Sequence, residues 1–174
     1  MKIKNLIDEN FVNYSKPSMF IVTSICSFKC DKEAGCQVCQ NSDLATAPIV
    51  EIPTEEIIER YLNNPITEAV VIGGLEPFDQ FDELVDFIAQ FRARSSDDIV
   101  IYTGYYPEEI WTQLLMLQDY SNIIIKFGRF IPNSPHKFDD LLKVELASDN
   151  QHAERLDSII NKLDKDLEEI INGN

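Results

Sequence analysis

Short apolar runs alternate along the chain with longer segments in which apolar residues recur every three or four positions. The short runs are rich in β-branched side chains and lie at residues 19–24, 69–72, 99–102 and 122–127. The longer segments have the period of amphipathic helices and lie at residues 54–62, 78–91 and 107–117. Strands that alternate with helices in this way predict an α/β fold with a mainly parallel sheet.

Local signals for helix starts agree with this assignment. Thr54 is a suitable N-cap residue, and Glu55 and Glu56 follow it, where the helix dipole favours acidic side chains. Pro107 suits the first turn of a helix, because an N–H at that position has no helical partner. Residues 128–149 have no regular period, and within them we expect only residues 142–146 to be extended.

The length of the chain limits the architecture. A chain of 174 residues is long enough for one compact domain and short for two. We therefore expect a single domain over residues 1–174, with a core at about residues 19–151. A complete eight-stranded barrel needs about 250 residues. The alternating pattern thus predicts a partial, open barrel of the TIM type.

Residues 152–172 form the last periodic segment. Its apolar side chains share one stripe of an otherwise charged helix and lie at Leu156, Ile159, Ile160, Leu163, Leu167, Ile170 and Ile171. We expect this C-terminal amphipathic helix to pack on the domain. Docking of a partner or of a second copy of the chain is the alternative.

Charge and hydropathy narrow the classes of partner. The net charge of −15 argues against nucleic acid, because proteins that bind a phosphate backbone carry clustered Lys and Arg. No apolar run reaches the roughly 18 residues that cross a bilayer, and residues 1–10 do not resemble a signal peptide. We therefore expect a soluble, cytoplasmic protein that acts on a protein or a small molecule.

All four cysteines fall in one short segment, with the spacing Cys26-x3-Cys30-x5-Cys36-x2-Cys39. Disulfides usually link distant loops in secreted domains, so this clustering indicates a metal site instead. Thiolates from one loop can hold an iron–sulfur cluster, and a set of three leaves one iron open. A zinc site with four thiolates is the alternative, although structural zinc usually joins two C-x2-C pairs across a longer module.

Three segments that carry chemistry follow successive predicted strands. The cysteine segment comes after residue 24, the turn at residues 73–77 follows the next strand, and Thr103 and Gly104 follow the one after that. Ligands of parallel α/β proteins bind at the carboxyl ends of the strands. We therefore expect the three segments to meet in one site.

The cysteine segment resembles the loop of the radical S-adenosylmethionine superfamily, which reads C-x3-C-x2-C with an apolar or aromatic residue before the last cysteine. Cys26 and Cys30 match the first half, whereas the second half carries an insertion. Cys39 follows Val38 and precedes Gln40-Asn41, which is similar to the C-H-N of glycyl-radical activating enzymes. The resemblance implies Cys26, Cys30 and Cys39 as the cluster ligands, with Cys36 as the alternative third ligand.

Four further segments, in order, resemble the activating proteins of anaerobic ribonucleotide reductase. They are Gly73-Gly74-Leu75-Glu76-Pro77, Tyr102-Thr103-Gly104-Tyr105, Gly128-Arg129-Phe130-Ile131 and Ser148-Asp149-Asn150-Gln151. The family commonly has an acidic residue just before that third segment, where this chain has Lys126-Phe127. The residues that the resemblance assigns to S-adenosylmethionine binding are Val38, Asn41, Gly73, Gly74, Glu76, Thr103, Gly104 and Asn150.

The resemblance implies an enzyme with a [4Fe–4S] cluster that cleaves S-adenosylmethionine to a 5′-deoxyadenosyl radical. The radical would be used to install a glycyl radical on anaerobic ribonucleotide reductase or another glycyl-radical protein, with a flavodoxin-like or ferredoxin-like electron donor. A radical enzyme that acts on a small molecule, similar to 7-carboxy-7-deazaguanine synthase, is one alternative. A non-enzymatic zinc or iron–sulfur binding module is the other.

Overall fold

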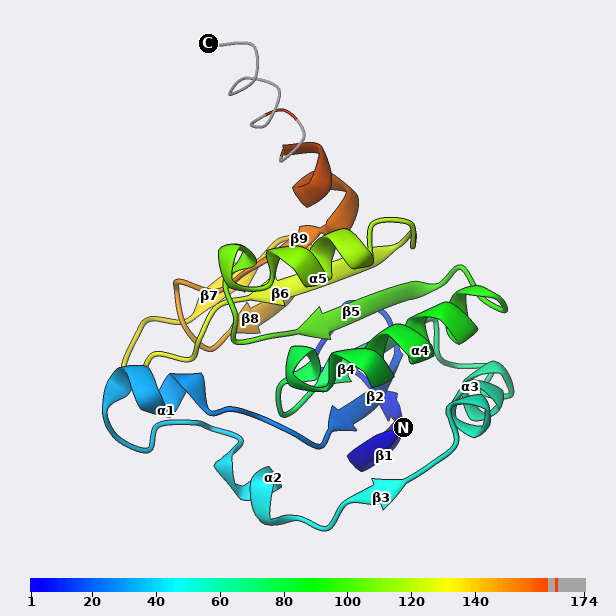
Figure 1. Ribbon diagram of the computed structural model, residues 1–174, viewed down its shortest axis with the longest axis horizontal. Coiled ribbons are helices and arrows are strands. Elements are labelled where there is room, and N and C mark those ends of the chain that lie inside the picture. The colour runs from blue at the N-terminus through cyan, green and yellow to red at the C-terminus, as the bar shows by residue number, and fades with distance from the viewer. Residues whose placement is uncertain (163–164, 166–174) are drawn as a thin grey trace.

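The computed structural model describes residues 1–162 and 165 and contains an open seven-stranded sheet (Figure 1). Its strands run in the order β3-β1-β2-β4-β5-β6-β9. Their bounds are β1 Lys2–Asn10, β2 Ser18–Thr23, β3 Val50–Glu51, β4 Ala69–Gly73, β5 Asp98–Tyr102, β6 Ile123–Phe127 and β9 His152–Arg155. A separate hairpin pairs β7 Lys137–Asp139 with β8 Val144–Leu146.

The four central strands are parallel and follow one another in sequence order. Strand β2 pairs with β4, β4 pairs with β5, and β5 pairs with β6, each in parallel. Crossovers between such neighbours are right-handed, which brings their helices to the same face of the sheet. That face carries α3 Thr54–Leu62, α4 Phe81–Arg92 and α5 Trp111–Met116 (Figure 1). The predicted α/β fold with a mainly parallel sheet is thus confirmed, and the sheet is not closed.

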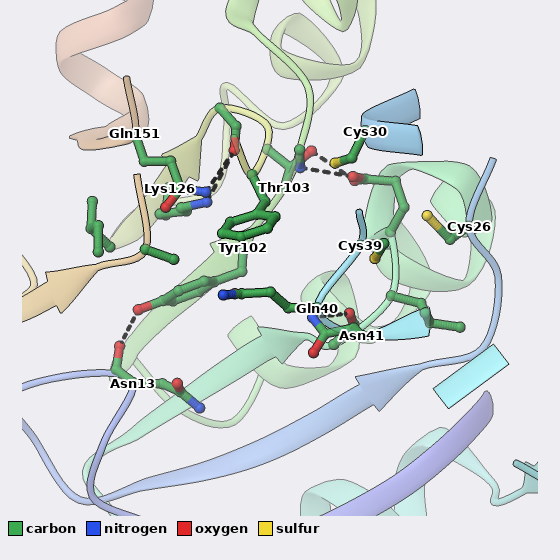
Figure 2. Close-up of a pocket in the computed structure, with 18 of the residues that line it drawn as sticks. Asn13, Cys26, Cys30, Cys39, Gln40, Asn41, Tyr102, Thr103, Lys126 and Gln151 are labelled. Atoms are coloured by element: carbon green, nitrogen blue, oxygen red, sulfur yellow. Dashed lines mark hydrogen bonds between the residues drawn. The ribbon is translucent and has the colours of Figure 1, made fainter. Parts of the chain in front are cut away.

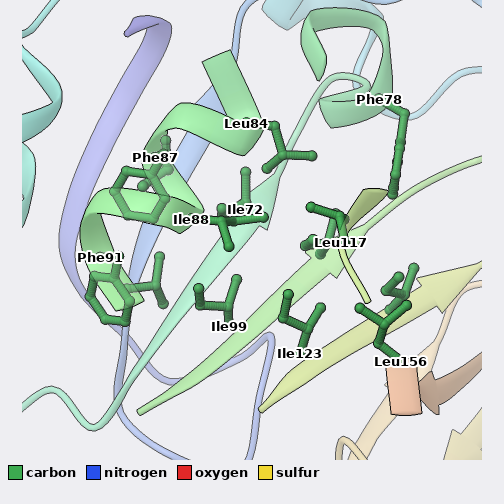
Figure 3. Packing of buried hydrophobic residues seen from close by; sticks show 14 of the residues in the cluster. Ile72, Phe78, Leu84, Phe87, Ile88, Phe91, Ile99, Leu117, Ile123 and Leu156 are labelled. Atoms are coloured by element: carbon green, nitrogen blue, oxygen red, sulfur yellow. The ribbon is translucent and has the colours of Figure 1, made fainter. Parts of the chain in front are cut away.

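Apolar residues fill both faces of the sheet. The larger core lies between the sheet and the helices and includes Phe87 and Phe91 of α4, which pack on Ile72 and Ile99 (Figure 3). The smaller core lies on the opposite face, where Val71 and other strand residues meet the β7–β8 hairpin. The central strands are therefore buried on both faces, which explains their nearly continuous apolar runs.

Two of the three expected helices begin with a short 3₁₀ turn. Residues 77–80 and 107–109 form 3₁₀ turns, η1 and η2, ahead of α4 and α5. Thr54 is the first residue of α3, and Pro53 occupies the cap position before it. Such turns tighten the chain between a strand end and the helix that packs behind it.

Two antiparallel strands differ from the expectations. The sequence pattern does not predict β1, which pairs with both β2 and β3. Residues 152–155, expected to begin the C-terminal helix, instead form β9 beside β6. The expectation was wrong for these four residues, because their backbone hydrogen bonds go to β6.

The C-terminal helix begins at Leu156. Leu156 and Ile159, the first two residues of the apolar stripe, are buried in the larger core. The rest of the stripe from Leu163 onward, which is Leu163, Leu167, Ile170 and Ile171, lies outside the described residues. No helix among the described residues is long and apolar enough to cross a membrane.

Candidate metal centre

The carboxyl ends of the parallel strands surround a cavity of about 400 Å³. The cysteine segment follows β2, and Gly74 and Glu76 follow β4 at the same edge. Thr103 and Gly104 follow β5. All three segments contribute to the cavity wall, as expected from the sequence, and Cys26, Cys30 and Cys39 lie on one side of it (Figure 2).

The cysteine segment, residues 26–47, bends back on itself so that Cys26 and Cys39 share this wall. It contains two short helices, α1 Lys29–Ala34 and α2 Ser42–Thr46, neither of which buries a residue. Asp31, which follows Cys30, accepts hydrogen bonds at 2.8 Å from the backbone N–H groups of both Val38 and Cys39. One side chain thereby ties the last cysteine to the second.

Cys36 lies apart from the other three cysteines. Its residue is exposed and it does not line the cavity, whereas Cys26, Cys30 and Cys39 are half-buried there. Gly35, immediately before it, has a left-handed backbone (φ +67°) that ends α1. This turn directs Cys36 to the surface before the chain returns to the cavity at Cys39.

The surroundings of Cys26 and Cys39 favour the neutral form of these two thiols in the metal-free protein. Burial raises the pKa of Cys26 to about 12, although the N–H of Phe28 donates to its Sγ at 3.3 Å. Burial likewise raises the pKa of Cys39, against a hydrogen bond from the Asn41 backbone. Iron binds the thiolate, so occupation of this site must release protons.

Glu76 joins the turn after β4 to the turn after β5. Its carboxylate accepts hydrogen bonds from Thr103 Oγ1 at 2.7 Å, from the Gly104 N–H at 2.9 Å and from the Phe78 N–H at 3.2 Å. Burial raises its pKa to about 7, and these three donors oppose the shift. The carboxylate therefore holds two walls of the cavity together.

The two adjacent glycines have different roles. Gly74 lines the cavity with φ +86°, and its carbonyl accepts a 2.8 Å hydrogen bond from Asn41 Nδ2. A Cβ at Gly74 would lie 2.6 Å from Val22 Cγ1, so the position requires glycine for packing as well as for its dihedral angle. Gly73 does not line the cavity, and its carbonyl accepts a 3.0 Å hydrogen bond from Thr23 Oγ1.

Comparison with known proteins adds to this geometry. The family model described as "4Fe-4S single cluster domain" matches residues 17–154, which include all four cysteines and the four parallel strands. The chain belongs to this family of iron–sulfur proteins. Comparisons with curated proteins and with solved structures give no match.

The residues of this 4Fe–4S domain fit a cluster. Three half-buried thiols face one cavity, and backbone N–H groups of Phe28 and Asn41 reach the sulfur atoms of Cys26 and Cys39. Such hydrogen bonds to sulfur tune the potential of a bound cluster. Among residues 1–162 and 165, no three Cys, His, Asp or Glu side chains are close enough to hold a single metal ion.

Most of the residues assigned to S-adenosylmethionine by resemblance lie on the cavity. These are Asn41, Gly74, Glu76, Thr103 and Gly104. Val38, Gly73 and Asn150 do not line it. Asn150 instead donates to the Arg129 carbonyl at 3.0 Å and to the Tyr106 hydroxyl at 3.2 Å, and so fastens the loop after β6.

Lys126 and Gln151 are cavity residues that the sequence reasoning did not assign. Lys126 is 7% exposed, and burial lowers its pKa to about 8. The one signal in the sequence is a lysine within the apolar run Ile123–Phe127, where a charge is unexpected. A buried ionisable group with a displaced pKa at a cavity wall is a common mark of a functional site.

Arg129, in the loop after β6, connects that loop to the cysteine segment through ion pairs. Its guanidinium is almost fully buried and pairs with Glu109 at 2.6 Å and with Glu33 of α1 at 3.0 Å. Lys29, also in α1, contacts the same Glu109 at 3.0 Å. Hydrogen bonds from Arg129 are the main reason that the pKa of Glu109 falls to about 2. The pairs connect the segment that carries Cys30 to the loop after β6.

Proposed function

We propose that this 4Fe–4S domain cleaves S-adenosylmethionine reductively and uses the resulting radical to activate anaerobic ribonucleotide reductase. The observation that carries the proposal is the arrangement of the cysteines. Cys26, Cys30 and Cys39 line one cavity, while Cys36 is exposed and lies outside it. Three thiolates for four irons leave one iron free to bind the amino and carboxylate groups of the cofactor.

A bound cluster would supply one electron to the sulfonium of S-adenosylmethionine, giving methionine and a 5′-deoxyadenosyl radical that takes a hydrogen atom from a glycine. The residues of the chain orient the cofactor and exclude water. Asn41, held on the Gly74 carbonyl, and the turn at Thr103-Gly104, held by Glu76, form walls of the cavity for this purpose. No proton transfer by a side chain is required.

The size and surroundings of the cavity support a ligand of this kind. A volume of about 400 Å³ is in the range of small-molecule sites, which is roughly 300–1,000 Å³. The strand order β2-β4-β5-β6, with the helices on one face, is also that of consecutive units in a β/α barrel. This order supports the interpretation of the open sheet as a partial barrel.

The proposed substrate is a protein, because the five segments from the cysteine loop to Ser148–Gln151 resemble reductase activators. The proposed partners are an anaerobic reductase, or another glycyl-radical protein, and a flavodoxin-like or ferredoxin-like electron donor. The strongly acidic chain, with its net charge of −15, supports partners other than nucleic acid.

The test is anaerobic reconstitution with iron and sulfide, followed by dithionite and S-adenosylmethionine. We expect 5′-deoxyadenosine by chromatography, and a glycyl radical by electron paramagnetic resonance when a cognate reductase is added. The control is Cys30→Ser, which removes one thiolate and should reduce deoxyadenosine formation to background. A cluster-loaded protein that forms no deoxyadenosine under these conditions contradicts the proposal.

Activity on a small molecule is the second candidate, favoured by the buried Lys126 and Gln151 on the cavity wall. A protein glycine offers no charge for this lysine to bind. Formation of deoxyadenosine without a glycyl radical in any reductase tested would support this candidate over the first.

A further inference from the structure

Two buried nitrogen donors lie side by side on the cavity wall, and neither is hydrogen-bonded to a cysteine in the described part of the chain. Lys126 is in β6 and Gln151 immediately precedes β9, and the two residues are 7% and 4% exposed. Lys126 Nζ and Gln151 Nε2 both donate to one acceptor, the Gly128 carbonyl, each at 3.1 Å. Figure 2 shows both nitrogen atoms converging on this oxygen.

These donors outnumber their acceptors. A lysine ammonium has three N–H groups and a glutamine carboxamide has two, whereas a carbonyl oxygen offers two lone pairs. In the described part of the chain, the Gly128 carbonyl is the only hydrogen-bond partner of either nitrogen. At least three N–H groups therefore remain for acceptors that a ligand or solvent in the cavity supplies, because buried donors without partners are costly.

Lys126 Nζ lies 5.8 Å from the centroid of the Tyr102 ring, but the ammonium has no anionic partner in contact in the described part of the chain. Glu76 and Cys30 lie near enough to Lys126 to favour its charged form. Glu76, however, already accepts hydrogen bonds from Thr103, Gly104 and Phe78. No ion pair includes Lys126 among residues 1–162 and 165. A buried ammonium in this position is stabilised best by an anionic group in the cavity.

We propose that Lys126 and Gln151 form an anion subsite that binds a carboxylate of a ligand held in this cavity. A carboxylate has two acceptor oxygens, which match an ammonium and a neighbouring amide N–H. It can belong to a separate carboxylic acid substrate, or to the methionyl part of S-adenosylmethionine, whose second carboxylate oxygen stays available when the first binds iron. The subsite goes beyond the proposed function, because its donors act on any carboxylate and do not require cofactor cleavage.

The first part of the test measures the affinity of the cluster-loaded protein for two cofactors by anaerobic calorimetry. S-adenosylmethionine and its decarboxylated analogue are titrated into wild type, Lys126→Met and Lys126→Arg. If the cofactor carboxylate occupies the subsite, Lys126→Met binds S-adenosylmethionine about 10- to 100-fold more weakly, as expected for a lost charged hydrogen bond. The analogue then binds wild type and Lys126→Met alike, and Lys126→Arg retains most of the affinity.

The second part uses acetate as the simplest carboxylate, with chloride at equal ionic strength as its control. If a separate acid occupies the subsite, acetate raises the melting temperature of wild type saturably and has no such effect on Lys126→Met or Gln151→Leu. In that case, S-adenosylmethionine binds wild type and Lys126→Met equally.

Folding and charge are controlled separately. Iron content and circular dichroism show whether Lys126→Met retains the fold and the cluster. Lys162→Met removes a lysine whose side chain is 67% exposed and should behave as wild type in both parts. The proposal is overturned if neither the cofactor affinity nor the acetate effect depends on Lys126. Deoxyadenosine formation is measured in parallel, so a failure of the radical chemistry is distinguished from a failure of the subsite.

Discussion

Asp31 helps to hold Cys39 at the cavity. Its carboxylate accepts the N–H groups of Val38 and Cys39, and hydrogen bonds to a charged group contribute about 1.5–3 kcal/mol each. Cys36 lies in the same segment, yet it is exposed because the turn at Gly35 directs it outward. At the scale of single residues, the Asp31 carboxylate and the left-handed backbone of Gly35 thus distinguish Cys39, a proposed cluster ligand, from the exposed Cys36.

This arrangement predicts different effects for the two cysteines of the C-x2-C pair. Cys39→Ser should lose the cluster, whereas Cys36→Ser should retain it, as measured by iron content and visible absorption after anaerobic reconstitution. Asp31→Ala should lower cluster occupancy several-fold, because Cys39 is no longer tied to Cys30. Asp31→Asn, which keeps an acceptor oxygen, should restore part of it. Retention of the cluster in Cys39→Ser and its loss in Cys36→Ser would reverse the assignment.

Elements of the cysteine segment depend on contacts outside themselves. α1 and α2 have six and five residues and bury none of them, so neither is stable alone. The contacts that hold the segment include Asp31, the ion pairs of Arg129 and the bond from Asn41 to Gly74. The strands behind it are different, because every residue of β4 and β6 is buried.

We therefore expect the cluster to order this segment. In hydrogen exchange followed by mass spectrometry, residues 26–47 should exchange quickly in the cluster-free protein and be protected after reconstitution. Ala69–Gly73 and Ile123–Phe127 should be protected in both states, which makes them internal controls. Equal protection of residues 26–47 in both states would show that the segment is held by protein contacts alone.

On the scale of the whole molecule, the folding core and the metal centre are separate. The larger core lies between the helices and the sheet, while the cysteines lie beyond the carboxyl ends of the strands (Figures 1 and 3). Phe87 is fully buried there and stacks on Phe91 with ring centroids 5.7 Å apart. Removal of such a side chain leaves a cavity that the surroundings fill only in part.

Phe87→Ala should lower the free energy of unfolding by about 3–5 kcal/mol, measured by urea denaturation of the cluster-free protein. Phe138→Ala is the matched control, because Phe138 is 58% exposed and its loss should change stability by no more than about 0.5 kcal/mol. The cluster-free wild type should still unfold in one cooperative transition. A non-cooperative transition would mean that the core requires the cluster.

The sequence by itself determined the central strands, the helices behind them and the edge of the sheet at which the candidate site residues lie. These features depend on local periodicity, and the carboxyl ends of parallel strands coincide in any fold of this class. The cysteine spacing likewise indicated a cluster, because the chemistry of thiolates is carried by the residue type. The resemblance added five cavity residues, among them Asn41, Glu76 and Thr103.

The tertiary structure alone decided features that depend on partners distant in sequence. Strand β9 forms because β6 offers an open edge, and no local pattern in residues 152–155 indicates that edge. Gly73 and Asn150 do not line the cavity, and their hydrogen bonds go to Thr23 and Arg129, which lie far from them in the chain. Lys126 is a third case: the proposed anion subsite depends on the fold, which places Gln151 and the cavity beside this lysine.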